Sequence, residues 1–441
     1  MTGSSAFPSI SIFSQSELVG RLQFIEPRLS TFIYDDFWVK NRFPISPCIP
    51  FNAEYSPQTI VNFLRNLFPE GDAFELLLVN NNLSKINLYA ILITLGMDTA
   101  GILSFTNIDY KEEKTLLREI TEKELITKLS NNNIQELITW DGKYRLSVAG
   151  VQNKLNVYIN EDNRFMLANG QYSSTHILKF ASEKYKSIVI NELFCMKLAK
   201  EVNLNVAAVC YRKFGCHDVL IVERFDRKST HEGVKKRHII DACQALDLPP
   251  EYKYEHNFGS NKDVQHIRDG VSLNKLFKFA KSCAVPIAVT QYLVDWLIFN
   301  LIIGNSDAHG KNVSFFIGAS GITITPFYDL VSVIYEASKN KKIDTSLAMA
   351  IGDNFDITSI TAYDLLSLAD EAGISFSFLN KRLARLSNII MKKVDNLCFD
   401  EFELFDKDLI IIEEIKRLVF QQANFFSQEA RIMSQVARET F

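Results

Sequence analysis

A dense polar stretch directly follows a strongly apolar segment of the chain. Residues 291–303 read QYLVDWLIFNLII, which is typical of a buried core helix, and residues 304–312 read GNSDAHGKN. A helix that is apolar on every side has to be enclosed by other elements. The polar residues after it therefore lie at the edge of a core, where binding and catalytic side chains are commonly found. We expect this helix to deliver Asp307, His309 and Asn312 to the rim of a ligand cleft.

The predicted elements fall into three successive parts. Residues 8–107 mix short β-type runs with helical patches and predict a small α+β subdomain. Residues 108–226 contain a charged stretch, 111–139, that we expect to be helical, then strands, a helix over 190–204 with Asn191 as its N-cap, and a hairpin. Residues 227–441 are mainly helical. This order predicts an α+β, bilobal protein-kinase-like fold with a β-rich N-lobe, an extra N-terminal α+β subdomain and an all-helical C-lobe.

The polar residues of the last part match the needs of phosphoryl transfer. That reaction requires a carboxylate near the acceptor hydroxyl, oxygen ligands for magnesium, and a cation on the phosphates. Asp307 and Asn312 have the spacing of the base and the metal-binding amide in kinase catalytic loops. Lys311 lies between them and is a candidate for neutralising the transferred group. Asp329, at the end of a predicted hairpin over 313–330, is the candidate second metal ligand.

The middle part supplies the candidates for phosphate binding. Lys179 ends a predicted strand, and Glu192 follows on the predicted helix, as the lysine and glutamate of a kinase N-lobe do. The chain contains neither GxGxxG nor GxxxxGK[ST], so 147-SVAGVQNK-154 is the segment left for a phosphate loop. Each residue alone has an ordinary structural explanation: a strand-end lysine is usually solvated, and an Asp after two aromatic residues often forms a turn. The order of the whole set is what favours a kinase.

Composition limits the partners and the compartment. The net charge is −4 and the isoelectric point about 6.1, so the chain as a whole is not a general polyanion binder. The cysteines are odd in number and form no CxxC pair, which favours free thiols in a reducing cytosol. The N-terminus shows no signal peptide pattern, and no apolar run reaches the ~18–20 residues of a membrane helix. We expect a cytoplasmic protein.

Several longer runs of the sequence resemble one known family. The chain is similar to the HipA family of bacterial serine/threonine kinases, the toxins of type II toxin–antitoxin modules linked to growth arrest and persistence. The resemblance extends from about residue 8 to the C-terminus. It is carried by RLSVAGVQNK, THILKF, NELFCMKLAKEVNLNV, VLIVERFDR, DACQALDLPPEYKYE, NLIIGNSDAHGKNVSFF, TPFYDLVSV and SLAMAIG.

The resemblance implies ATP and Mg²⁺ as cofactors and a role for each matching position. It implies that Asp307 is the catalytic base and Ser147 an autophosphorylation site whose modification silences the enzyme. Lys179 would hold the α- and β-phosphates, and Asn153 stands where the family commonly has an acidic residue. The remaining implied contacts are a phosphate loop of Ala149, Gly150, Val151, Gln152, Asn153 and Lys154, a hinge of Glu223, Arg224 and Phe225, triphosphate and metal contacts by His309, Gly310, Lys311 and Asn312, and a metal site completed by Tyr328 and Asp329.

The resemblance also implies partners, and two other functions stay open. Relatives phosphorylate aminoacyl-tRNA synthetases and bind a small helix-turn-helix antitoxin of HipB type, through which the pair contacts operator DNA. One alternative is therefore a corepressor that acts with such an antitoxin on operator DNA. The other is a metallophosphoesterase, because 307-DAH-309 has an Asp-x-His ligand pattern.

Overall fold

The structure is a computed structural model that describes residues 9–96, 98–107, 115–131, 136–137, 139–141, 143–145, 153–170, 172–230, 233–259 and 263–440. The chain divides into two compact units. The first comprises Met1–Lys179, Val222–Pro250 and Ser314–Ile322, and the second comprises Phe180–Ile221, Glu251–Val313 and Thr323–Phe441. The chain thus crosses between the units several times. The predicted divisions at 107 and 226 stay a prediction.

The N-terminal part of the first unit is a small α+β subdomain, as expected. Its sheet has the order β3-β2-β1-β4, with antiparallel neighbours. Along β2, Leu22 and Phe24 are buried while Arg21 and Gln23 are exposed, which is the alternation of a sheet with one covered face. The elements are β1 (Ser9–Ser14), β2 (Glu17–Glu26), β3 (Leu29–Tyr34), α1 (Asp36–Asn41), α2 (Pro57–Arg65), α3 (Gly71–Asn80), α4 (Leu88–Leu95) and β4 (Leu103–Asn107).

The second sheet of the first unit contains the consecutive strands β10-β8-β9-β5. The expectation of helix throughout 111–139 is wrong at 116–119, because β5 pairs with β9 there and sheet pairing overrides helix propensity. The elements are β5 (Leu116–Glu119), α5 (Glu122–Ser130), β6 (Thr139–Trp140), β7 (Lys143–Tyr144), β8 (Lys154–Ile159), β9 (Phe165–Asn169), β10 (His176–Phe180), β13 (Arg227–Thr230), β14 (Gly233–Lys236), β15 (Ile239–Asp241), α8 (Ala242–Ala245), β16 (Ser314–Gly318) and β17 (Gly321–Ile324).

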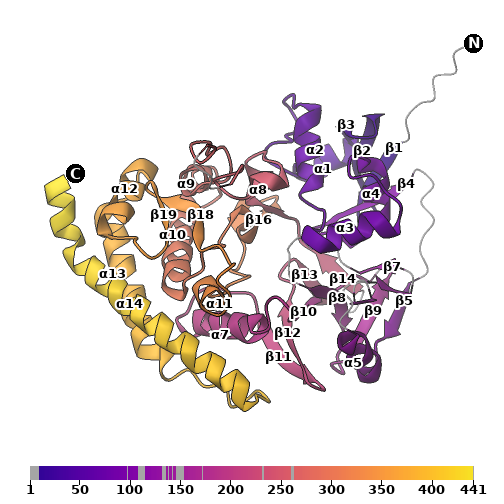
Figure 1. The fold of residues 1–441 in the computed structure, drawn as a ribbon. Helices are drawn as coiled ribbons and strands as arrows, with labels where there is room; N and C mark the ends of the chain where they lie inside the picture. Colours follow the sequence, from indigo (N-terminus) through magenta and orange to yellow (C-terminus); the bar gives the residue numbers. More distant parts are fainter. Residues whose placement is uncertain are drawn as a thin grey trace, which may run out of the picture. The chain divides into compact units, whose positions relative to one another are not determined.

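The second unit is mainly helical. Its long antiparallel helices α13 and α14 pack side by side (Figure 1). The expectation of an all-helical C-lobe over residues 227–441 is wrong, because this range contains the strands β13 to β19, including the hairpin of β18 and β19 in this unit. The elements are α7 (Ile188–Glu201), β11 (Val209–Phe214), β12 (His217–Glu223), η1 (Pro250–Tyr252), α9 (Leu273–Ala280), α10 (Pro286–Ile303), η2 (Gly310–Asn312), α11 (Val333–Lys339), β18 (Ser346–Ile351), β19 (Asn354–Asp356), α12 (Ala362–Ala372), α13 (Phe376–Val394) and α14 (Asp406–Thr440).

Helix α10 is the core of the second unit. Every residue from 293 to 303 is buried, because α9, α13 and α14 pack around the helix. With 18 residues it is long and apolar enough to cross a membrane by length and composition, contrary to the sequence expectation, and it is the one such helix in the described ranges. Of that window 67% is buried inside the fold, as in the core helix of a globular protein.

Candidate active site

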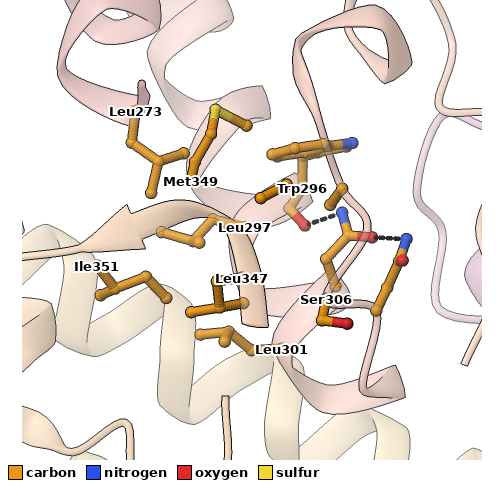
Figure 2. Close-up of a pocket in the computed structure, with 12 residues that line it drawn as sticks. Leu273, Trp296, Leu297, Leu301, Ser306, Leu347, Met349 and Ile351 are labelled. Atoms are coloured by element: carbon orange, nitrogen blue, oxygen red, sulfur yellow. Dashed lines mark hydrogen bonds between the residues drawn. The ribbon is translucent and has the colours of Figure 1, made fainter. Parts of the chain in front are cut away.

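The end of α10 is shaped to present the polar stretch that follows it. Gly304 has a φ of +71°, a left-handed conformation that ends the helix without a Cβ penalty. The Asn305 backbone N–H donates to the Asn300 carbonyl at 2.8 Å. The side-chain amides continue this link, because Asn305 donates to Asn300 at 2.7 Å and Asn300 donates to the Trp296 carbonyl at 2.8 Å (Figure 2). The chain therefore leaves the helix along one fixed path.

A small cavity lies beside this turn. Figure 2 shows that apolar side chains dominate its lining, with Ser306 at one side. Its volume of about 20 Å³ has room for roughly one water molecule. The Ser306 carbonyl accepts a hydrogen bond from the Ala348 N–H at 2.8 Å, which ties the turn to β18. This hydrogen bond supports the loop, and the cavity is far too small for a nucleotide.

The second unit brings together the site residues predicted between 307 and 329. The Asn312 side-chain amide donates to Asp329 Oδ2 at 3.3 Å, although the two residues are 17 positions apart. The side-chain oxygen of Asn312, Oδ1, accepts from the His309 backbone N–H at 3.1 Å. The Tyr328 hydroxyl donates to the Lys311 carbonyl at 2.7 Å. His309, Gly310 and Lys311 are buried, whereas Asp307 is exposed.

Asp329 has an unusual backbone. Its φ is +53°, in the left-handed region that aspartate tolerates better than most residues. The residues after it are clamped to α7, because the fully buried Asn191 accepts from the Ser332 N–H at 2.8 Å and donates to the Ser332 carbonyl at 3.0 Å. Asn191 is therefore not the N-cap that its sequence context suggested. Ser187 occupies the cap position.

Asn312 and Asp329 have the right chemistry for a shared magnesium ion. Mg²⁺ prefers oxygen ligands and is usually held by one or two carboxylates together with substrate phosphates. The described residues contain no group of three or more His, Cys, Asp or Glu that could hold a metal. A carboxylate and an amide 3.3 Å apart therefore suit an ion that takes its other ligands from the nucleotide. These two residues do not form a complete metal site by themselves.

The first unit carries a pair of buried lysines. Lys154 on β8 and Lys179 on β10 occupy directly paired positions, and they are 5% and 6% exposed. Directly paired residues extend from the same face of an antiparallel sheet, where two like charges disfavour each other. An anion bound beside both ammonium groups would be attracted by both charges. This pair is therefore a candidate phosphate-binding element, and Asn153 precedes it at a half-buried position.

The predicted hinge begins at the end of β12. Glu223 is exposed, and the half-buried Phe225 packs edge-to-face on Phe316. The Arg224 side chain is buried and makes a two-pronged ion pair with Asp226, at 3.0 and 2.9 Å. It also donates to the Ser174 hydroxyl at 2.8 Å. The Arg224 side chain is thus fully engaged within the fold. Its backbone is engaged as well, because the N–H donates to the Thr175 carbonyl at 2.9 Å and the carbonyl accepts from the Arg227 N–H at 3.0 Å.

Two parts of the predicted site stay predictions. Ser147 and the loop residues Ala149, Gly150, Val151 and Gln152 lie outside the described residues. Lys154 and Lys179 belong to the first unit, and the residues around Asp307 belong to the second. That both sets act on one nucleotide stays a prediction.

One residue of the site escaped the sequence analysis. Tyr254 donates a hydrogen bond from its hydroxyl to Asp307 Oδ1 at 2.8 Å. It lies in 251-EYKYE-255, at the end of one of the family-like runs. The two residues are 53 positions apart, so no local spacing connects them.

The sheet-rich first unit, the helical second unit and the Asp-x4-Asn loop are features of a protein-kinase-like enzyme. Family models match both parts of the chain: the HipA N-terminal domain over residues 10–106 and the HipA-like C-terminal domain over residues 146–396. The chain belongs to the HipA family, and it is a kinase of the serine/threonine type.

Individual relatives agree with this assignment. The serine/threonine-protein kinase toxin HipA of Shewanella oneidensis is 43% identical over 86% of this chain and 86% of its own length. The Sinorhizobium fredii protein Y4mE is 30% identical over 85% of this chain and 88% of its own. Among solved structures, a complex of Shewanella oneidensis HipA, HipB and operator DNA contains a chain that matches with a TM-score of 0.87 and 37% identity. That match covers 97% of this chain and 99% of the other.

Proposed function

We propose that this protein is an ATP- and Mg²⁺-dependent protein kinase that acts as the toxin of a type II toxin–antitoxin system in the cytoplasm. The observation that carries this proposal is the contact between Asn312 and Asp329, beside the loop that bears Asp307. That arrangement gathers a proton acceptor and two oxygen ligands in one region of the second unit.

Each residue has a role that its chemistry supports. Asp307 is exposed, as a base must be to accept the proton of an incoming serine or threonine hydroxyl. Asn312 and Asp329 would hold Mg²⁺, which supplies charge neutralisation on the phosphates when it is bound. The ammonium group of Lys311 would offset charge on the transferred phosphoryl group. Lys154 and Lys179 would bind the triphosphate, with the remaining nucleotide contacts made by residues 149–153, by His309, Gly310 and Tyr328, and by the hinge residues 223–225.

The relatives support a toxin role. The similar Shewanella protein is named a toxin, and its solved complex contains HipB and operator DNA. We infer that this chain also binds a small helix-turn-helix antitoxin, and that the pair represses its own operator. With a net charge of −4, the kinase itself is poorly suited to neutralise DNA phosphates, so the antitoxin would make most of those contacts.

The substrate and the self-regulation are the finer parts of the proposal. We propose a translation factor such as an aminoacyl-tRNA synthetase as the substrate, whose phosphorylation arrests growth. Ser147 is the proposed site of autophosphorylation. A phosphate there adds a charge of about −1.5 to −2, and this charge would repel a triphosphate bound by the neighbouring segment 149–154.

Radiolabelling tests the proposed function. Wild-type protein incubated with γ-³²P-ATP, Mg²⁺ and heat-treated bacterial lysate is expected to label a discrete protein band, and EDTA should abolish that label. The kinase's own band tests Ser147 in the same gel, because Ser147→Ala should remove that label and leave the lysate band. The absence of any labelled lysate band, with folded protein, would contradict the kinase assignment.

A further inference from the structure

Tyr254 is placed to control the geometry of Asp307. Its hydroxyl donates to Oδ1 of the carboxylate at 2.8 Å, and its ring meets the His309 ring edge-on, with centroids 5.2 Å apart. The carboxylate of Asp307 is exposed, and an aspartate χ2 torsion has broad, shallow preferences. A donor fixed in the protein restricts that rotation, because a hydrogen bond to a charged oxygen is strongly directional.

Tyr254 can act as a fixed donor because its neighbours in the chain are fastened. The Lys253 carbonyl accepts from the Gly310 N–H at 2.9 Å, so the residue before Tyr254 is tied to the loop that holds the base. On the other side, the Glu255 N–H donates to the Ala348 carbonyl at 2.9 Å. The buried Glu255 carboxylate accepts from the Ala350 N–H at 2.8 Å.

Close packing also holds the backbone around Tyr254 in place. A Cβ added to Gly270 would lie 1.8 Å from the Tyr254 carbonyl oxygen, so the two backbones are in direct contact there. Arg268 pairs with Glu255 at 2.6 Å and adds a charged link across the turn. A segment fastened in this way is unsuited to swing aside as a gate, and it is suited to hold a side chain at one place.

We propose that Tyr254 is a positioning residue for phosphoryl transfer: by occupying Oδ1 of Asp307, it directs Oδ2 toward the hydroxyl of the protein acceptor. Among the described residues, no hydrogen bond engages Oδ2 of Asp307, so this oxygen can take the acceptor proton, and one carboxylate oxygen is enough for that step. This inference rests on the proposed function and adds a residue to it. The proposal gives Tyr254 a role in the transfer step and none in nucleotide binding, because the Tyr254 hydroxyl contacts the catalytic base Asp307.

Tyr254→Phe tests the role of the hydroxyl, since the variant keeps the ring against His309. The measurement is the initial rate of ³²P transfer from ATP into the most strongly labelled lysate band, at varied ATP concentration. We expect kcat to fall about tenfold, a part of the ~10²–10⁴-fold that a positioned base contributes. We expect KM for ATP and the thermal unfolding midpoint to stay at the wild-type values.

Tyr252→Phe is the matched control. It removes a hydroxyl from the same turn, where the Tyr252 ring packs on Phe258, and it should leave kcat unchanged. An unchanged kcat in Tyr254→Phe would overturn the proposal, as would a higher rate, which would mean that the hydroxyl competes with the acceptor. A loss of ATP affinity by the same factor as the loss in kcat would also overturn the proposal. These results concern Tyr254 alone, whereas a wild-type protein that labels nothing would refute the proposed function itself.

Discussion

Asp307→Asn is expected to lower phosphoryl transfer by ~10²–10⁴-fold, because asparagine cannot accept the proton of the attacking hydroxyl. Binding of Mg²⁺ and ATP should stay within about twofold of wild type, since the proposed magnesium ligands Asn312 and Asp329 are unchanged. The fold should tolerate the change, because Asp307 is exposed. Single-turnover transfer of ³²P and calorimetric ATP binding measure the two effects separately.

Asp370→Asn is the matched control for this variant. Asp370 is an exposed aspartate at the end of α12, in the same unit, so it reports the cost of removing a surface charge. Its rate should equal that of wild type. If Asp307→Asn transferred phosphate at the normal rate, another group would have to be the base.

The second large effect is expected in the first unit, where a buried ion cluster joins the N-terminal subdomain to the segment after β12. Asp226 pairs with Arg224 and, at 2.6 Å, with Arg227. It also accepts from the Gly101 N–H at 2.9 Å, and Arg227 donates to the Thr99 carbonyl at 2.6 Å. Asp226, Arg224 and Arg227 are all 5% exposed or less.

Asp226→Asn is expected to cost about 3–5 kcal/mol of unfolding free energy, the usual loss when one partner of a buried ion pair is removed. The two arginines would then lack their main counter-charge. Urea unfolding followed by tryptophan fluorescence measures this loss in a Trp296→Phe background. The remaining tryptophans, Trp38 and Trp140, both lie in the first unit and report its unfolding. Glu26→Gln, at an exposed pair with Arg28, should cost less than about 1 kcal/mol. A loss that small in Asp226→Asn would show that the cluster contributes little.

The same cluster predicts a dependence on pH. Burial opposes ionisation of Asp226, but Arg224 and Arg227 overcome it and hold the pKa of that carboxyl well below its ordinary value. The folded pKa is therefore lower than the unfolded pKa of about 3.9. Asp226 thus contributes its full stability above about pH 4 to 5 and loses it as the pH falls further. In Asp226→Asn, this part of the acid unfolding should disappear.

Much of the fold could be predicted because its signals are local. The hairpin β11–β12, the strand β10 and the core helix α10 follow from periodicity and turn residues, and they appear where the sequence predicted them. The strand β5 could not be predicted in this way, because its charged sequence gains strand structure only through pairing with β9. Asn191 was misassigned for a similar reason, since its partner Ser332 is 141 residues away.

The candidate site shows the same contrast between local sequence signals and contacts made only in the folded chain. The Asp-x4-Asn spacing predicts Asp307 and Asn312 as site residues, and element order predicts Asp329. Tyr254 has no spacing relation to them, and only the folded chain brings its hydroxyl to Asp307. For Arg224 the family resemblance implies a nucleotide contact, and the structure shows its side chain in the buried cluster with Asp226, so that contact stays a prediction.

The most direct measurement is Mg²⁺-dependent ATP binding by Lys179→Met, Asp329→Asn and the double variant. If one lysine of the first unit and one aspartate of the second hold the same triphosphate, each single change should weaken binding by roughly 10-fold or more, the loss of a charged contact. The double variant should then lose less than the sum of the two, because the sites share a ligand. Lys235→Met, at an exposed lysine of the first unit, should bind normally. Normal ATP affinity in either single variant would contradict a shared nucleotide site.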